Sequence, residues 1–568
     1  MTSKSYFFAG TVALAMIVAG TATFVGCNSD ESSSAPAGFS QLGEHRGGQS
    51  ELFQTIARNL NELERYENAQ VLPHTRDLLN QWAQREQPAA TWKPDPLTKS
   101  LPDELQKIAV TTSLDRQGYS LADAQFLETC MWLRDIARRL ARASGGSQFD
   151  ELTVAQALFD WTVRNIQLDP DGETKASRFP GEILLAGKGS AAERAWIFIL
   201  LARQQQLDAV MLALADEAGA LQTWAPAVLV KGELYLFDPR LGLPIPAGDS
   251  SRMFQKSSGA EASEPQVATL RQVLSDPARL RSLDLNAEHP YPHKAEDLKN
   301  LIVLVEASPQ FLTRRMKLIE GKLTGNERAV LTVDASALAA QAQKAAGVRD
   351  VRLWSLPYEV WRDREDPESP ASQNVAQQLA ILEPSSNVTL WKARVLQFKG
   401  KFDGEEGAKQ HYMAWRAPTR KLELARKHPE VLMAKDERLP GEPLEAGTKP
   451  VTFAELDARR ARLETMKTDA TYWLGLVAFE EENYPSARDY FGRRTLEAAP
   501  DGPWTGGATY NLARTAEATG DVAKAIELYS GDTSPQSHGN QLRARWLEAA
   551  GKKQPAAKSA EREAAAGK

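Results

Sequence analysis

The sequence is poor in cysteine and histidine, with two cysteines (Cys27 and Cys130) and seven histidines among 568 residues. Two cysteines exclude a disulfide-rich scaffold, and no histidine falls in the most strongly patterned segment, residues 179–241. His289 and His293 stand close together but have no further ligand at a sensible spacing, so a metal site is not expected. Within residues 265–360 no glycine-rich phosphate loop joins a strand to its helix, so no nucleotide site is expected there, and no cofactor is assigned to the sequence.

A large excess of charge is also missing. The formal net charge is −6 and charged residues make up 25% of the chain, without a basic face interleaved with aromatic residues. Binding to nucleic acid is therefore not expected. Hydrophobic residues make up 42%, which is ordinary for a globular protein, and the length leaves room for more than two domains.

Residues 1–26 have the pattern of a signal peptide. Lys4 precedes a long uncharged stretch, and Phe24-Val-Gly-Cys27 resembles the bacterial lipobox, in which the cysteine becomes diacylated. This resemblance implies lipidation at Cys27 and a lipid-anchored location in the cell envelope, on the extracytoplasmic (periplasmic) side. A plain secretory signal and an uncleaved anchor are the alternatives, since the apolar run is close to spanning length. Residues 27–49 are expected to form a flexible tether.

Residues 50–149 are expected to be a helical region, because apolar residues recur there at every third or fourth position. Cys130 falls on one of the expected helices. If Cys27 carries lipid, Cys130 has no cysteine to pair with. A small buried apolar side chain is the favoured interpretation of Cys130, over a reactive thiol.

The segment from 179 to 241 carries three local patterns. Gly187-Lys-Gly189 precedes a helix in which positions 195–202 are all apolar, which predicts a buried helix. Ser190-Ala-Ala-Glu193 has the sequence of a capping box, which favours a structural role for Ser190 over an anion site or a nucleophile. Short apolar runs on either side of Lys231-Gly232 predict a β-hairpin.

This order of elements resembles the core of the transglutaminase-like (papain-type) superfamily, over residues 150–245. In that family a cysteine starts the buried helix, and two following strands supply a histidine and an aspartate. By the spacing of the family, these three positions are Ala191, Thr223 and Asp238 in this sequence. The resemblance thus implies the α+β fold of the family with a catalytically degenerate site. Asp238, which precedes Pro239, is expected to bond its own turn.

Residues 265–360 alternate between strand and helix patterns. Strands are expected at 301–305, 329–333 and 348–354, with helical segments between them. This β-α-β-α-β order predicts a small α/β unit.

Residues 375–548 are expected to form helical repeats. Two segments match at a period of 38 residues, which aligns Ala487 with Ala525. The unit resembles the tetratricopeptide repeat, and this resemblance implies a protein partner of unknown identity. Trp504 lies in the Pro/Gly-rich linker between the two units and is expected to face that partner. The Ala/Lys/Glu-rich tail, 549–568, is expected to be disordered.

The expected fold class is therefore a multidomain α+β protein with helical regions at both ends. The first functional hypothesis is a membrane-anchored, non-enzymatic interaction or scaffold protein, with a degenerate core and partner-binding repeats. The second is an active hydrolase or acyltransferase, in which Ser190 uses a histidine from elsewhere, such as His289 or His293. The third is a purely structural envelope scaffold.

Overall fold

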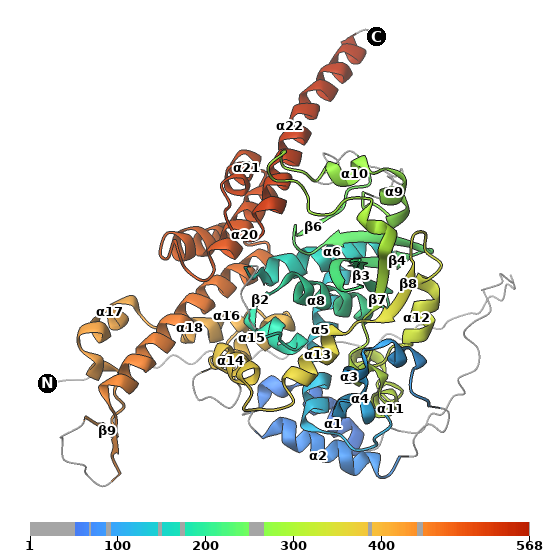
Figure 1. The fold of residues 1–568 in the computed structure, drawn as a ribbon. Coiled ribbons are helices and arrows are strands. Elements are labelled where there is room, and N and C mark those ends of the chain that lie inside the picture. Colours follow the sequence, from blue (N-terminus) through green and yellow to red (C-terminus); the bar gives the residue numbers. More distant parts are fainter. Residues whose placement is uncertain are drawn as a thin grey trace, which may run out of the picture. The chain divides into compact units, whose positions relative to one another are not determined.

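The computed structural model describes residues 51–66, 70–86, 92–145, 150–170, 176–217, 219–248, 266–383, 389–439 and 447–566 (Figure 1). The expected signal peptide (1–26), the tether (27–49) and Cys27 lie outside these ranges. Residues 49–568 form one compact unit. Among the described helices, none combines the length and the apolar character needed to cross a membrane.

The centre of this unit is a mixed six-stranded sheet in the order β6-β5-β4-β3-β7-β8. The strands are β3 (Ala209–Ala215), β4 (Leu221–Val230), β5 (Glu233–Asp238), β6 (Leu243–Pro244), β7 (Leu301–Val305) and β8 (Asp350–Leu353). β7 and β8 run parallel, and the other neighbouring pairs run antiparallel. Strands expected in two separate units, 150–245 and 265–360, thus share one sheet. The reason is that β3 is buried along nearly its whole length and has a neighbour on each edge.

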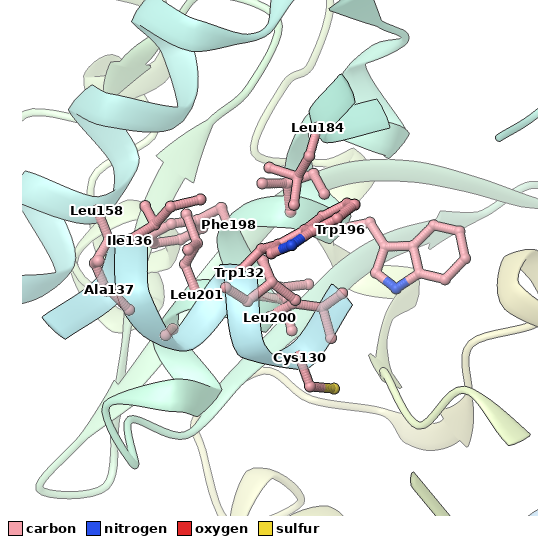
Figure 2. Close-up of a cluster of buried hydrophobic side chains, with 14 of the residues drawn as sticks. Cys130, Trp132, Ile136, Ala137, Leu158, Leu184, Trp196, Phe198, Leu200 and Leu201 are labelled. Atoms are coloured by element: carbon pink, nitrogen blue, oxygen red, sulfur yellow. The ribbon is translucent and has the colours of Figure 1, made fainter. Parts of the chain in front are cut away.

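Helices from three parts of the chain pack on one face of this sheet. They are α5 (Leu121–Ala143), α6 (Glu151–Asn165) and α8 (Ala191–Gln204). Figure 2 shows their side chains interleaved, with Trp132 and Ile136 from α5 close to Phe198 and Leu201 from α8. Every residue from 193 to 204 is buried, which confirms the expected buried helix.

The opposite face of the sheet is covered by shorter helices. Among them are α9 (Leu270–Ser275), α10 (Ala278–Arg281) and α12 (Ala335–Ala342).

The N-terminal helices are α1 (Glu51–Asn61), α2 (Val71–Ala83), α3 (Asp103–Gln106) and α4 (Ala109–Thr112). Cys130 lies on α5 and is buried, as expected.

The strand expected at 329–333 does not join the sheet, and this prediction was wrong. α11 (Arg314–Glu320) precedes it, and the segment itself makes no ladder. Side chains take over its backbone hydrogen bonds: the Val330 amide donates to Gln204 Oε1 at 3.1 Å, and the Leu331 amide donates to Glu320 Oε1 at 3.0 Å. An apolar run therefore does not identify a strand when neighbouring side chains can satisfy its backbone.

The chain after β8 is mainly helical. Its helices are α13 (Leu356–Asp363), α14 (Pro370–Leu379), α15 (Trp391–Phe398), α16 (Ala408–Ala414), α17 (Thr419–Lys427), α18 (Phe453–Glu480), α19 (Tyr484–Arg488) with the π-helical η8 (Asp489–Leu496), α20 (Thr505–Ala518), α21 (Val522–Ser530) and α22 (Ser537–Ala566). Ala487 and Ala525, one period apart, are both fully buried. α22 continues to Ala566, through most of the tail that was expected to be disordered.

The C-terminal helices pack against the sheet-bearing part of the same unit through polar contacts. Asn511 on α20 donates to the Arg164 carbonyl of α6 at 3.1 Å. Arg514, one turn later, pairs with Asp160 of α6. The cationic Arg514 and Arg164 hold the pKa of the half-buried Asp160 carboxyl well below its usual range, against the effect of burial. These contacts hold α20 against α6.

Candidate functional site

The first turn of α8 is built around Ser190 and Glu193. Ser190 Oγ accepts a hydrogen bond from the Glu193 amide at 3.2 Å, and Glu193 Oε2 accepts one from the Ser190 amide at 2.8 Å. This is the expected capping box, and it is confirmed. Glu193 Oε1 also accepts from the Arg178 amide at 2.8 Å. Ser190 thus serves as the N-cap of the most buried helix near the sheet.

The three positions expected of a catalytic triad lie toward the same end of the sheet. Ala191 begins α8, and its methyl group offers no nucleophile. Thr223 lies near the start of β4, opposite Ala213 of β3. β4 and β5 form the expected hairpin, with positive φ angles of 51° at Lys231 and 84° at Gly232. The hairpin brings Asp238, at the end of β5, back toward the start of β4.

Arg194 ties the start of α8 to this end of the sheet. Its guanidinium donates to the carbonyl oxygens of Ile166 at 2.6 Å and Pro239 at 2.8 Å, and to Gln536 Oε1 at 2.8 Å. Burial lowers the pKa of Arg194 to about 10. A charged residue at the start of an apolar helix was the sequence signal for this contact, but its partners could not be identified from spacing.

Asp238 is held in a chain of buried hydrogen bonds. Its Oδ1 accepts from the amides of Arg240 and Leu241, both at 2.8 Å, which confirms that it bonds its own turn. Its Oδ2 accepts from the Tyr291 hydroxyl at 2.5 Å, and Trp224 Nε1 donates to that hydroxyl at 2.7 Å. Burial and the Asp238 charge raise the pKa of Tyr291 well above its usual value. Both carboxylate oxygens of Asp238 are therefore engaged.

Of the two neighbouring histidines, His293 lies at this site. Its ring centroid is 5.9 Å from that of Trp224 and 5.6 Å from that of Tyr291. Burial lowers the pKa of His293, while the Asp238 charge acts in the opposite direction. His289 is exposed, with its Nδ1 at 3.2 Å from Asn286 Oδ1. His293 falls outside residues 150–245, so the family spacing could not assign it to this site.

Trp504 lies inside the protein, which corrects the expectation that it faces a partner. Its side chain is 2% exposed and stacks on Tyr472 with ring centroids 4.3 Å apart. Its Nε1 donates to Asp469 Oδ1 at 2.6 Å, and Lys188 Nζ lies 4.1 Å from its ring centroid. The Pro/Gly-rich linker folds back onto the turn before α8, where Lys188 Nζ donates to the Pro503 carbonyl at 2.9 Å. The surface that Trp504 contacts is thus part of its own chain.

Within the described ranges, no group of three or more His, Cys, Asp or Glu side chains is arranged to hold a metal ion. Comparisons with protein-family models, curated proteins and solved structures gave no match.

Proposed function

We propose that this protein is a lipid-anchored, non-enzymatic interaction protein of the cell envelope. Its sheet-bearing part would be a degenerate transglutaminase-like core, and its C-terminal helices would be tetratricopeptide-like repeats. The succession of α6, the buried α8 and the β4–β5 hairpin supports the first assignment. The buried small residues Ala487 and Ala525, each on the second helical segment of a helical pair, support the second.

The observation that carries this proposal is the bonding of Asp238. In an active triad, the aspartate orients a histidine that activates the nucleophile. Here Tyr291 and two backbone amides occupy the carboxylate oxygens, and the nucleophile position is Ala191. Thr223 cannot act as a general base at neutral pH. The hydrogen bonds of Asp238 are therefore those expected of a residue with a structural role.

The surface that would contact a protein partner is better sought on α16, α17 and the start of α18 than at Trp504. Three large apolar side chains are exposed there: Met413 at 46%, Leu424 at 47% and Phe453 at 53%. Each of these side chains belongs to a helix of the expected repeat region and is accessible to another protein. Replacement of Leu424 and Phe453 by serine should abolish capture of a partner from solubilised envelopes, with the thermal midpoint unchanged. If this variant still captures the partner, these helices do not form the contact surface.

The experiment that tests the absence of catalysis uses purified protein with peptide and cell-wall substrates. No amidase, peptidase or transamidase turnover is expected. Ser190→Ala should lower the free energy of unfolding by about 1 kcal/mol, as expected for loss of an N-cap. Turnover that disappears in Ser190→Ala, with folding intact, would contradict the proposal.

A second candidate is a hydrolase or acyltransferase that uses Ser190. The position of His293 beside Tyr291 and Trp224 favours it, because an imidazole then lies near Asp238. This candidate requires turnover that is lost in both Ser190→Ala and His293→Ala. His289→Ala is the matched control, since that ring is exposed. Loss of turnover in His289→Ala alone, or in neither histidine variant, would exclude it.

A further inference from the structure

An apolar cavity lies between α5, α7 (Pro180–Ala186) and α8, away from the site around Asp238. Its volume is about 170 Å³. Aromatic rings dominate its wall, among them Phe126, Trp132, Phe179, Trp196 and Trp361. Figure 2 shows Trp132 from α5 and Trp196 from α8 among the buried side chains between these helices. An apolar cavity of about 150 Å³ takes up a benzene molecule, so this one has room for a single ring or a short alkyl group.

Glu128 places a carboxyl group in this apolar wall. Its side chain lines the cavity and is 5% exposed. Its Oε1 has no hydrogen-bond partner among the described residues. Burial raises the pKa of Glu128 to about 8. Leaving a buried polar atom without a partner costs free energy, so a ligand that supplied a donor would recover that cost.

The other carboxylates near the cavity already have cationic partners. Glu182 accepts from Arg364 at 3.0 Å, and Arg364 stacks over Phe179 at 5.4 Å from the ring centroid. Glu306, which accepts from Trp196 Nε1, pairs with Arg203.

Among the described residues, the charge of Lys399 opposes the effect of burial on Glu128, but Lys399 itself pairs with Glu64, which also pairs with Lys401. The thiol of Cys130 stays neutral, because burial raises its pKa. Glu128 is therefore the carboxyl group at the cavity that has no direct cationic partner among the described residues.

We propose that this cavity binds a small organic ammonium ion, with the ammonium group at Glu128 and an aromatic or short alkyl group among the surrounding rings. Aromatic faces attract cations, most strongly where water is excluded. A carboxylate beside them supplies the counter-charge and a charge-assisted hydrogen bond. A neutral molecule of the same shape would fill the cavity without forming the ion pair.

Isothermal titration of the full-length protein tests this with benzylammonium, benzyl alcohol and benzoate as probes. Benzylammonium is expected to bind more tightly than the alcohol by at least about tenfold, and benzoate should not bind. Below pH 8, where Glu128 carries a proton, binding of benzylammonium should release close to one proton per site. The proton count follows from titrations in two buffers that differ in ionisation enthalpy.

Two variants separate the ion pair from simple filling of the cavity. Glu128→Gln keeps the shape and should remove both the tenfold preference for the ammonium probe and the proton release. Glu104→Gln, at an exposed carboxylate on α3, is the matched control and should change neither. Ala122→Phe, at the cavity wall, should weaken binding of all probes while the melting curve shows a folded protein. Equal affinities for alcohol and amine, unchanged ammonium binding in Glu128→Gln, or no binding of any probe would overturn the proposal.

Discussion

Tyr291 donates a hydrogen bond of 2.5 Å to Asp238, which lies 53 residues earlier in the chain. The contact joins the loop after α10 to the end of β5, and Trp224 on β4 completes it. The rings of Tyr291 and Trp224 also lie beside that of His293. These residues are the natural first target for mutation.

Tyr291→Phe should destabilise the protein without changing its overall packing. The substitution removes the donor to Asp238 and the acceptor for Trp224, and a buried hydrogen bond to a charged group contributes about 1.5–3 kcal/mol. We expect the free energy of unfolding in a denaturant titration to fall by about that amount. Tyr235→Phe, at a half-buried tyrosine on β5, is the control and should stay within about 0.5 kcal/mol of wild type. Equal effects of the two substitutions would show that the bond to Asp238 contributes little.

The stability of the protein should depend on the protonation of Glu128. Its pKa is about 8 in the folded protein, raised by burial from an ordinary value of 4.5 despite the opposing charge of Lys399. Between these two values the unfolded chain loses a proton that the folded protein retains. The free energy of unfolding should therefore decrease as the pH rises through this window, by as much as a few kcal/mol.

The measurement is denaturant unfolding at pH 5 and pH 8 for wild type and Glu128→Gln. The variant cannot ionise at this position. Its free energy of unfolding, relative to that of wild type, should therefore be higher at pH 8 than at pH 5. A constant difference between the two proteins would mean that Glu128 ionises normally in the folded state.

Ala525→Leu should overpack the contact between α20 and α21. Ala525 is fully buried on the inner face of α21, and extra methyl groups in a well-packed contact cost about 1–3 kcal/mol. The thermal midpoint should fall accordingly. Ala523→Leu adds the same volume on the exposed face of the same helix and should leave the midpoint unchanged. If both variants melt like wild type, the repeat register is wrong.

Cys27→Ser should abolish membrane anchoring. If Cys27 is diacylated, the wild-type protein incorporates labelled fatty acid and remains with the membrane fraction. The variant should incorporate no label and be released or left unprocessed. Absence of label in the wild type, with equal mobility and membrane retention of the two proteins, would exclude the lipoprotein assignment.

Local features of the fold could be predicted from the sequence because their causes lie within a few residues. The capping box at Ser190 and Glu193, the buried helix after it and the turn at Lys231-Gly232 each depend on a short pattern. The bonding of Asp238 to its own turn is equally local.

Features that depend on distant segments could not be predicted in the same way. Trp504 lies in a linker typical of an exposed loop, yet Tyr472 and Lys188 enclose it. His293 reaches Trp224 only because the loop after α10 returns to the sheet. The segment 329–333 has a strand-like composition, but Gln204 and Glu320 satisfy its backbone. In each case the deciding partner lies many positions away, and no spacing rule points to it.

The hydrogen bond between Arg194 and Gln536 spans 342 positions of the chain and has a consequence for biosynthesis. During translation or export, the arginine emerges long before the glutamine that completes its bonding. Until then a charged side chain in the helix nearest the sheet lacks one of its acceptors, and burying it is costly. The nascent chain should therefore remain open around α8 and depend on folding helpers until Gln536, just before the last helix, has emerged. A truncation that removes Gln536 together with α22 would leave the whole protein, rather than only its end, prone to degradation.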